Sequence, residues 1–300
     1  MSLSVLNMLG GGGANVTIDG VKVKDKLNLI TEIIDMSVSQ LPYSFKHGCA
    51  VVVGGEIHIL GNYYSSYSTS HYKWDGSSWT SVSTLPYEFY QGCAVVLNGE
   101  IHILGSGNSR YNRSHYKWNG SSWTSVSTLP YSFYYGSAVV LDGNIHIFGG
   151  SSQNTNHCEW NGSSWTYVKD IPYNFDGGSA VVINNEVHIL GTTNSSYYTA
   201  HYKWNGSSWT SVSTLPYNFY YGSAVVFNGE IHILGGNSRP KNYYKWDGIS
   251  WTSFSTLPYG FYNASAVVFD GEIHILGDGD GSANNIAHYV LQRKRFKEVA

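Results

Sequence analysis

Histidine is the residue type whose number and spacing in this sequence could most readily support chemistry. The chain has 12 histidines, and all but His47 belong to two series that recur along its length. The first series comprises His58, His102, His146, His188, His232 and His274, and the second comprises His71, His115, His157, His201 and His288. Imidazole nitrogens bind transition metals and exchange protons near neutral pH. A convergent set of these side chains could therefore form a metal centre or an acid–base site.

The elements that must position these histidines belong to an internal repeat. The tripeptide Leu-Pro-Tyr, or Ile-Pro-Tyr in one copy, begins at Leu41, Leu85, Leu129, Ile171, Leu215 and Leu257. Each copy contains four short strand patterns, and a period of about 44 residues built only of strands is typical of β-propeller blades. We therefore predict an all-β fold. Residues 35–300 form a six-bladed propeller of four-stranded antiparallel blades, and residues 1–34 form a short N-terminal head.

The predicted propeller argues against a metal centre. Equivalent residues of different blades lie much farther apart than the roughly 2 Å that a metal–ligand bond allows. For the first histidine series we expect packing between blades, and for the second series we expect polar residues at strand edges. No metal or other cofactor is predicted.

The second repeat illustrates how the sequence defines one blade. Residues 92–97 form an apolar run, which we expect to be the innermost strand with both faces buried. Asn98-Gly99 is typical of a tight hairpin turn, and residues 100–105 alternate, so that His102 lies on the face opposite the isoleucines. The third and fourth strands are expected at 115–118 and 123–127, joined by a turn at 119–122.

These features resemble the kelch repeat. Kelch blades carry a hydrophobic strand that ends in Gly-Gly, an aromatic residue in the next strand and a tryptophan in the outer strand. The glycine pair is present at Gly149-Gly150 and Gly235-Gly236, whereas the other repeats keep one glycine. The aromatic positions are Tyr72, Tyr116, Tyr202 and Tyr244, and the tryptophans are Trp79, Trp123, Trp165, Trp209 and Trp251. The resemblance implies a kelch-type propeller.

Two segments match the outer strand of the last blade. Residues 296–300 follow the sixth repeat, with Phe296 in place of the tryptophan, whereas residues 36–42 match residues 80–86. We expect the C-terminal segment to fill the last blade and the N-terminal segment to cross beside it, which would close the ring.

Composition narrows the function classes. Charged residues make up 12% of the chain, against about 25% in average globular proteins, and the net charge is -3. No basic run extends beyond residues 293–295, so the electrostatic signature of a nucleic-acid-binding protein is missing. No stretch is long and apolar enough to span a membrane. Cys49 and Cys93 occupy a position that is serine in the other repeats, which indicates a packing position rather than a disulfide.

The connections between strands differ in how much they vary among repeats. The turn after the first strand and the Asn-Gly-Ser-Ser turn after the third strand hardly change. We call their edge of the blades the framework face and the opposite edge the variable face. The variable connections are rich in Tyr, Ser, Asn and Gly, a mixture that antibody paratopes use for rigid contact area and adaptable hydrogen bonds. They predict a ligand face for a glycan or a protein epitope, and tolerated drift in surface loops is the alternative.

The candidate ligand residues come from two sets of variable connections. The connections between blades contribute Lys46, His47, Tyr90, Gln91, Tyr134, Tyr135, Asp176, Tyr220, Tyr221, Tyr262 and Asn263. The connections between second and third strands contribute Tyr64, Tyr67, Arg110, Tyr111, Tyr197, Tyr198 and Arg239.

Enzymatic interpretations are disfavoured because no blade alone carries a base, a nucleophile and an orienting group. Kelch-type oxidases hold copper with a Tyr-His cluster and a crosslinked cysteine, and no such cluster departs from the repeat in this chain. Sialidase-like propellers use several arginines, and only Arg110, Arg113 and Arg239 lie in variable loops. Residues 278–281 could contact calcium but are more typical of an ordinary loop. We expect a protein that is not an enzyme and keep a carbohydrate-active propeller as an alternative.

The N-terminal head differs in character from the repeats. Residues 10–13 are a glycine tract typical of a flexible hinge, residues 16–18 and 21–23 flank Asp19-Gly20 as a small hairpin, and residues 25–34 could form a short helix. A short apolar segment followed by a glycine tract resembles the N-termini of some phage tail and baseplate proteins of Gram-positive hosts. A disordered leader is the alternative.

The resemblance of the head implies docking to particle or baseplate proteins through residues 1–34. It also implies a location in a virion or, before release, in the bacterial cytoplasm, in keeping with the poor match of residues 1–9 to a secretory signal. We therefore expect a receptor-binding or adhesion component of a phage tail or similar particle, which recognises a cell-surface glycan or protein. A scaffold that joins partners within a particle is the alternative, and the oligomeric state is left open.

Overall fold

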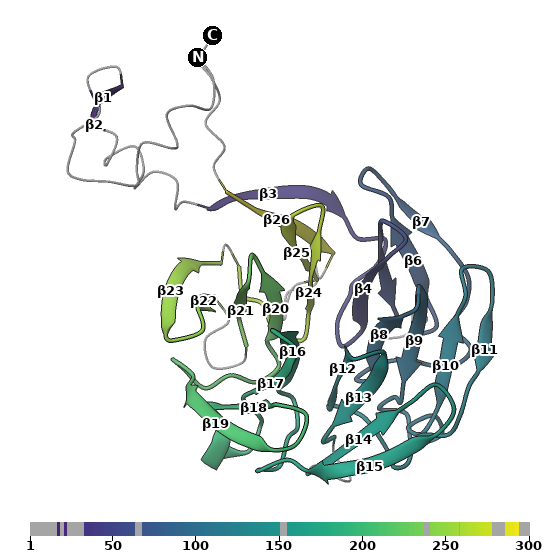
Figure 1. Ribbon diagram of the computed structural model, residues 1–300. Coiled ribbons are helices and arrows are strands. Elements are labelled where there is room, and N and C mark those ends of the chain that lie inside the picture. The colour runs from purple at the N-terminus through teal and green to yellow at the C-terminus, as the bar shows by residue number, and fades with distance from the viewer. Residues whose placement is uncertain are drawn as a thin grey trace. The chain divides into compact units, whose positions relative to one another are not determined.

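Four-stranded antiparallel sheets recur along the chain and are arranged around a common axis as the six blades of a propeller (Figure 1). The computed structural model describes residues 17–18, 21–22, 33–63, 68–150, 155–236, 241–257, 259–277 and 286–293. The innermost strands of successive blades contact one another, and the last contacts the first, so the ring is closed. The all-β fold and the blade number predicted from the repeat are confirmed.

The blades follow one another in chain order, and each runs from an innermost strand at the axis to an outermost strand at the rim. The first contains β4 (Cys49–Val53), β5 (Glu56–Leu60), β6 (His71–Trp74) and β7 (Trp79–Ser81), and the second contains β8 (Cys93–Leu97), β9 (Glu100–Leu104), β10 (His115–Trp118) and β11 (Trp123–Ser125). The third contains β12 (Ser137–Leu141), β13 (Asn144–Phe148), β14 (Asn156–Trp160) and β15 (Trp165–Asp170). The fourth contains β16 (Ser179–Ile183), β17 (Glu186–Leu190), β18 (Ala200–Trp204) and β19 (Trp209–Thr214), with the short 3-10 helix η4 (Ser195–Tyr197) between β17 and β18. The fifth contains β20 (Ser223–Phe227), β21 (Glu230–Leu234), β22 (Asn242–Trp246) and β23 (Trp251–Thr256), and the sixth contains β24 (Ser265–Phe269), β25 (Glu272–Leu276), β26 (Ala287–Arg293) and β3 (Ile33–Gln40).

The hydrophobic core lies between successive blades. One cluster joins Val95 and Leu97 of the second blade to Ile145 and Ile147 of the third, and equivalent clusters join further pairs of blades. Burying these apolar side chains contributes about 25 cal/mol for each Å² removed from water. The interface between blades, rather than any single sheet, is therefore the stabilising unit.

The second strand of each blade, not the innermost one, is the most deeply buried. In β9, Ile101, His102, Ile103 and Leu104 are at most 1% exposed, whereas the inner strand β8 is largely half-buried. The prediction of an innermost strand buried on both faces was wrong. Neighbouring blades cover both faces of a second strand, while the innermost strands converge on the axis and cover one another less completely.

The turns of the framework face form as their residue types predict. Asn98 and Gly99 have φ angles of 53° and 77°, the left-handed values that a two-residue hairpin turn requires. In the turn after β10, Asn119 Oδ1 accepts hydrogen bonds from the backbone N–H of Ser121 at 3.0 Å and of Ser122 at 2.9 Å. Asp75, Asn161, Asn205 and Asp247 make the same turn in other blades.

The glycine that follows each second strand is required by the neighbouring blade. Gly105 has a φ of +65°, and a Cβ added to it would lie 1.9 Å from the carbonyl oxygen of Phe133 in the next connection. The second glycine of the kelch-like pair is dispensable where a polar side chain replaces it. Ser106 Oγ, for example, donates a hydrogen bond to the carbonyl of Glu88 at 2.7 Å. This explains why several repeats keep only the first glycine.

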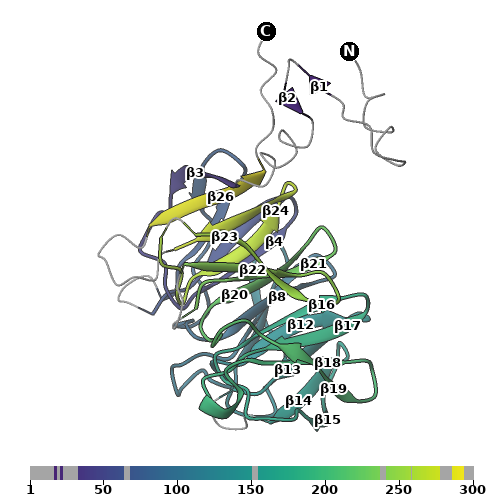
Figure 2. The same cartoon turned by 90° about the vertical axis from the view of Figure 1, so that its left-hand side faces the viewer.

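The N-terminal strand closes the ring, so the predicted closure by the C-terminal segment was wrong. β3 is the outermost strand of the sixth blade and pairs with β26, as Figures 1 and 2 show from two directions. The Leu41 N–H donates to the carbonyl of Ile286 at 2.8 Å, just as Leu129 N–H donates to Arg113 at 2.9 Å. Residues 296–300 lie outside the described residues.

A small unit comprising residues 1–34 and 292–300 separates from the propeller, residues 35–291. Within it, β1 (Thr17–Ile18) and β2 (Val21–Lys22) pair antiparallel around Asp19-Gly20. The glycine tract lies outside the described residues, as does most of the expected helix at 25–34, whose last two residues begin β3 instead. In the part of the chain that is described, no helix is long and apolar enough to cross a membrane.

Candidate functional site

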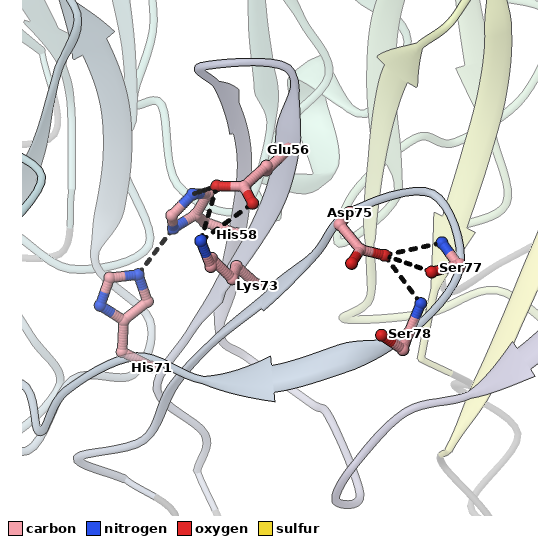
Figure 3. A network of polar contacts seen from close by, with 7 residues as sticks. All are labelled: Glu56, His58, His71, Lys73, Asp75, Ser77 and Ser78. Atoms are coloured by element: carbon pink, nitrogen blue, oxygen red, sulfur yellow. Dashed lines mark hydrogen bonds and ion pairs between the residues drawn. The ribbon is translucent and has the colours of Figure 1, made fainter.

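The two histidine series meet inside the blades. In the first blade, His58 on β5 faces His71 on β6, and Nδ1 of His58 lies 2.8 Å from Nε2 of His71 (Figure 3). The same hydrogen bond joins His102 to His115, His146 to His157, His188 to His201 and His274 to His288. In the fifth blade, Tyr243 takes the place of the second histidine, and its hydroxyl lies 2.7 Å from His232 Nδ1.

These histidine pairs are buried and neutral at pH 7. Burial lowers the pKa of His58, His102, His188 and His274 to about 4. Burial, followed by repulsion from its partner imidazole, lowers the pKa of His71, His115, His157, His201 and His288 to about 3. The second series is at most 1% exposed, so its predicted placement as polar residues at strand edges was wrong.

The histidine pairs hold neighbouring blades together. The His102 ring lies 5.4 Å from the ring of Trp160 in the next blade, which confirms the packing between blades predicted for the first series. His115 Nδ1 lies 3.3 Å from Ser127 Oγ, which also accepts a hydrogen bond from Trp165 Nε1 at 3.1 Å. Among the described residues, no three His, Cys, Asp or Glu side chains are grouped to hold a metal ion. We therefore assign the histidine pairs a structural role in packing neighbouring blades together.

A second feature involves the connections between blades, at the axis on the variable face. There, one residue from each blade donates its backbone N–H to the carbonyl of its counterpart in the preceding blade. The six residues are His47, Gln91, Tyr135, Gly177, Tyr221 and Asn263, with N···O distances of 2.7 to 2.9 Å, and His47 donates to Asn263, which closes the circle. The same residues line a depression together with the residues that follow them, Gly48, Gly92, Gly136, Gly178, Gly222 and Ala264. We call these six residues and the depression the axial mouth.

The backbone of the axial mouth is held in an unusual conformation. The φ angles of the six residues lie between 56° and 68°, in the left-handed region, where a residue other than glycine costs roughly 1–2 kcal/mol. Gly177 shows that glycine fits this position, yet the other blades carry His, Gln, Tyr or Asn. Because the backbone satisfies its own hydrogen bonds, no side chain is needed to maintain the turn.

Aromatic rings continue from the axial mouth into the surrounding loops. The Tyr135 ring lies 5.4 Å from Tyr221 and 6.1 Å from His47, and Tyr221 lies 5.7 Å from Tyr262. Gln91 Nε2 donates a hydrogen bond to the Tyr135 hydroxyl. Gly177 makes room for this arrangement, because a Cβ at that position would lie 2.7 Å from the Tyr221 ring.

The titratable side chains at and beside the axial mouth include one cation, Lys46, and one carboxylate, Asp176. Burial, aided by the charge of Lys46, lowers the pKa of His47 to about 4. Burial, aided by the charge of Asp176, raises the pKa of Tyr135 to about 12, and both effects also raise the pKa of Tyr221. Burial raises the pKa of Asp176 itself to about 6, although a hydrogen bond from the Thr193 side chain opposes the shift.

The candidates from the connections between blades all lie at or beside the axial mouth. Tyr90, Tyr134, Asp176, Tyr220 and Tyr262 directly precede its residues in the chain, as does Lys46, whose Nζ lies 5.6 Å from the Tyr262 ring. The other set is divided. Tyr198 stacks on Tyr220 at 5.1 Å, whereas Tyr111 and Tyr197 stack on the buried Tyr87 and Tyr173 and serve packing. Arg110 is exposed, and Tyr64, Tyr67 and Arg239 lie outside the described residues.

Two residues of the site were missed by sequence reasoning. Tyr63 is 44% exposed, and its ring lies 5.3 Å from His47 and 5.2 Å from Tyr90. Gly177 belongs to a variable connection between blades but is not among the predicted ligand residues. Its alignment with Tyr135 and Tyr221, directly before the small residue that opens each inner strand, was a usable signal.

Comparison with known proteins identifies the fold and no family. No protein-family model matches the sequence, and no curated protein matches it. The solved structure of YjhT is similar, with a TM-score of 0.73 and 17% sequence identity over 86% of this chain and 96% of that chain. In all, 501 chains of solved structures match. A fold shared so widely carries no function by itself.

Proposed function

We propose that this chain is a non-enzymatic binding module whose ligand is recognised at the axial mouth of the variable face. The observation that carries the proposal is the set of bulky side chains retained at left-handed positions where glycine fits. The His, Gln and Tyr side chains among them cost stability without being needed to hold the turn. A ligand that these side chains contact gives a physical reason for keeping them.

The chemistry of the axial mouth favours a glycan as the ligand. Tyr135, Tyr221 and Tyr262 offer aromatic faces on which the apolar side of a sugar ring can stack, and they offer hydroxyls as hydrogen-bond partners. Gln91 and Asn263 add amide groups. A protein epitope is the second ligand class that such a surface suits. The kelch-type resemblance agrees with a loop-built binding face.

We further propose that the particle context is a phage tail or similar assembly in which the propeller acts in host attachment. The support is the resemblance of the N-terminal start, an apolar segment followed by a glycine tract, to the N-termini of tail and baseplate proteins. In this proposal residues 1–34 dock to the particle, and the axial mouth contacts a cell-surface glycan or protein receptor.

The test is binding of the purified protein to a glycan array and to whole Gram-positive cells. A Tyr135→Ala/Tyr221→Ala variant removes the central aromatic pair. Tyr167→Ala is the matched control, because Tyr167 is a 59% exposed tyrosine on the outer strand β15. Saturable binding that the double variant loses and the control retains supports the proposal. Equal binding by all three proteins, or binding through the head alone, overturns it in favour of a scaffold.

A further inference from the structure

The order of the hydrogen-bonded ring places unlike charges on opposite sides of the axial mouth. Lys46 precedes His47 of the first blade, and Asp176 precedes Gly177 of the fourth. These blades are three steps apart in either direction around the circle of hydrogen bonds. The four residues in the corresponding positions of the other blades are all tyrosines: Tyr90, Tyr134, Tyr220 and Tyr262. The residues directly before the mouth residues thus comprise four tyrosines, a lysine on one side and an aspartate on the opposite side, while Tyr135 and Tyr221 line the depression itself.

The backbone of Asp176 is fixed by two hydrogen bonds, and its carboxylate accepts one from the Thr193 side chain without having a cationic partner among the described residues. The Asp176 N–H donates to Thr192 Oγ1 at 3.2 Å, and its carbonyl accepts from the Thr193 N–H at 2.7 Å. Oδ1 of Asp176 is inaccessible to water and, among the described residues, accepts no hydrogen bond. A partly buried carboxylate without a cation nearby is unfavourable, and its raised pKa agrees with that environment.

The titratable groups on which Asp176 acts electrostatically are Tyr135 and Tyr221. Both are neutral phenols at pH 7, so they cannot balance its charge. Their rings can contribute instead to binding a cation, because the face of a tyrosine ring attracts a cation placed over it. Lys46, on the opposite side of the mouth, repels a cationic group of a ligand. Such a group is therefore directed toward Asp176.

We propose that the axial mouth selects a sugar carrying a free, protonated amine, with the ammonium group seated among Tyr135, Tyr221 and Asp176. This inference rests on the proposed function, because it assigns the ligand class of the same site. The sugar ring stacks on the neighbouring tyrosines, and the ammonium group supplies the positive charge that Asp176 lacks. An N-acetylated sugar has no such charge and binds less tightly.

The experiment compares titration of a glucosamine tetrasaccharide with titration of its fully N-acetylated counterpart at pH 7, using the full chain. Loss of the cation–π and charge contacts predicts roughly tenfold weaker binding of the acetylated sugar. The isosteric Asp176→Asn variant should lose this preference. Glu88→Gln is the matched control, since it removes an exposed carboxylate that contacts Asn108 at 2.6 Å on the same face, and it should keep the preference.

Several outcomes overturn the inference. Equal affinity for the two tetrasaccharides does so, and so does a preference that survives in Asp176→Asn. Binding of a lysine-containing tetrapeptide in place of the amino sugar shows that the mouth takes cationic peptides and not sugars. If only neutral glycans bind and the Tyr135→Ala/Tyr221→Ala variant loses them, the proposed function holds and this inference falls. If no ligand depends on the mouth, both fall.

Discussion

The turns of the framework face and the axial mouth both contain residues with positive φ, but different groups hold this conformation in the two regions. Both place residues at positive φ; the mouth position recurs in all six blades and the turn of the Asn119 type in five. In the turn at Asn119, the side chain itself accepts the hydrogen bonds that hold the turn. In the axial mouth, the backbone groups bond to one another around the axis, so the turn needs no side-chain acceptor.

This difference explains which sequence positions repeat and which vary. Where the side chain holds the turn, only Asn or Asp serves, so the residue type recurs from blade to blade. Where the backbone holds the turn, the side chain is free to be selected for contact with a ligand. Uniformity at a repeated position is thus expected of a structural role, and variety at a strained position is what the proposed recognition function would produce. The following predictions test this distinction, from the largest expected effect to the smallest.

Lowering the pH should produce the largest loss of stability, because the histidine pairs are buried between the blades and have a structural role. Their native pKa values of about 3 to 4 lie below the unfolded value of about 6.5. The unfolded chain thus binds more protons, and stability falls as the pH drops from about 6.5 toward 4. A single shift from 6.5 to about 4 corresponds to about 3 kcal/mol. Urea unfolding followed by tryptophan fluorescence at pH 7, 6, 5 and 4 should show cooperative acid unfolding of the whole propeller.

The His115→Tyr variant is the control for acid unfolding, because it copies the pair of His232 and Tyr243 in the fifth blade. With one basic group fewer to protonate, it should lose less stability between pH 7 and pH 5 than the wild-type protein. A free energy of unfolding that stays constant over this pH range would contradict the assignment of the histidine pairs to the framework.

The next largest loss of stability is expected from substituting Gly105, the glycine that packs against the next blade. Gly105→Ala places a Cβ 1.9 Å from the Phe133 carbonyl oxygen at a φ of +65°. Overpacking and backbone strain together should cost about 3 kcal/mol. Chemical denaturation measures the loss, and Gly99→Ala serves as the control, since nothing lies within 4 Å of its added Cβ. A similar loss in both variants would show that the contact between blades is unimportant.

A smaller loss is expected from the framework turn. Asn119→Ala removes the acceptor of three hydrogen bonds in an exposed turn and should cost about 1 kcal/mol. Asn119→Asp should be nearly neutral, because Asp75 and Asp247 make the same turn. If Asn119→Ala were as stable as the wild-type protein, the side chain would not be what holds the turn.

The smallest change in stability is expected at the axial mouth. Gln91→Gly relieves left-handed strain but loses the hydrogen bond to the Tyr135 hydroxyl. The two effects oppose each other, so the free energy of unfolding should remain within about 1 kcal/mol of the wild-type value. A loss of several kcal/mol would mean that the side chains of the mouth are structural after all.

The repeat predicted the blades well because periodic strand patterns and turn residues act locally. The strand that closes the ring was predicted wrongly because two segments share the outer-strand pattern. The apolar pattern alone does not distinguish between them. Ser39 of the strand that does close the ring makes a specific contact: its Oγ lies 3.0 Å from His288 Nδ1 and accepts a hydrogen bond from Trp79 Nε1 at 3.1 Å. Ser127 has the same role in its blade, and residues 296–300 contain no serine.

The candidate site was predicted in its loops but not in its geometry. The variable connections between blades pointed to His47, Tyr135 and their counterparts. Their convergence depends on hydrogen bonds between residues a full repeat apart and on a backbone conformation that Tyr and Gln seldom adopt. No local pattern encodes either feature, so the position of Tyr63 beside His47 became visible only in three dimensions.

The most direct test of the central claim measures both binding and stability for Tyr135→Ala/Tyr221→Ala and for Asn119→Ala. We expect a crossed result. The mouth variant should lose binding to glycans or cells while it stays folded, with a free energy of unfolding lowered by about 2 to 4 kcal/mol for the ring contacts removed. Asn119→Ala should lose stability and keep full binding. A mouth variant that binds normally, or that loses binding only because it unfolds, would contradict the assignment of the axial mouth as the recognition site.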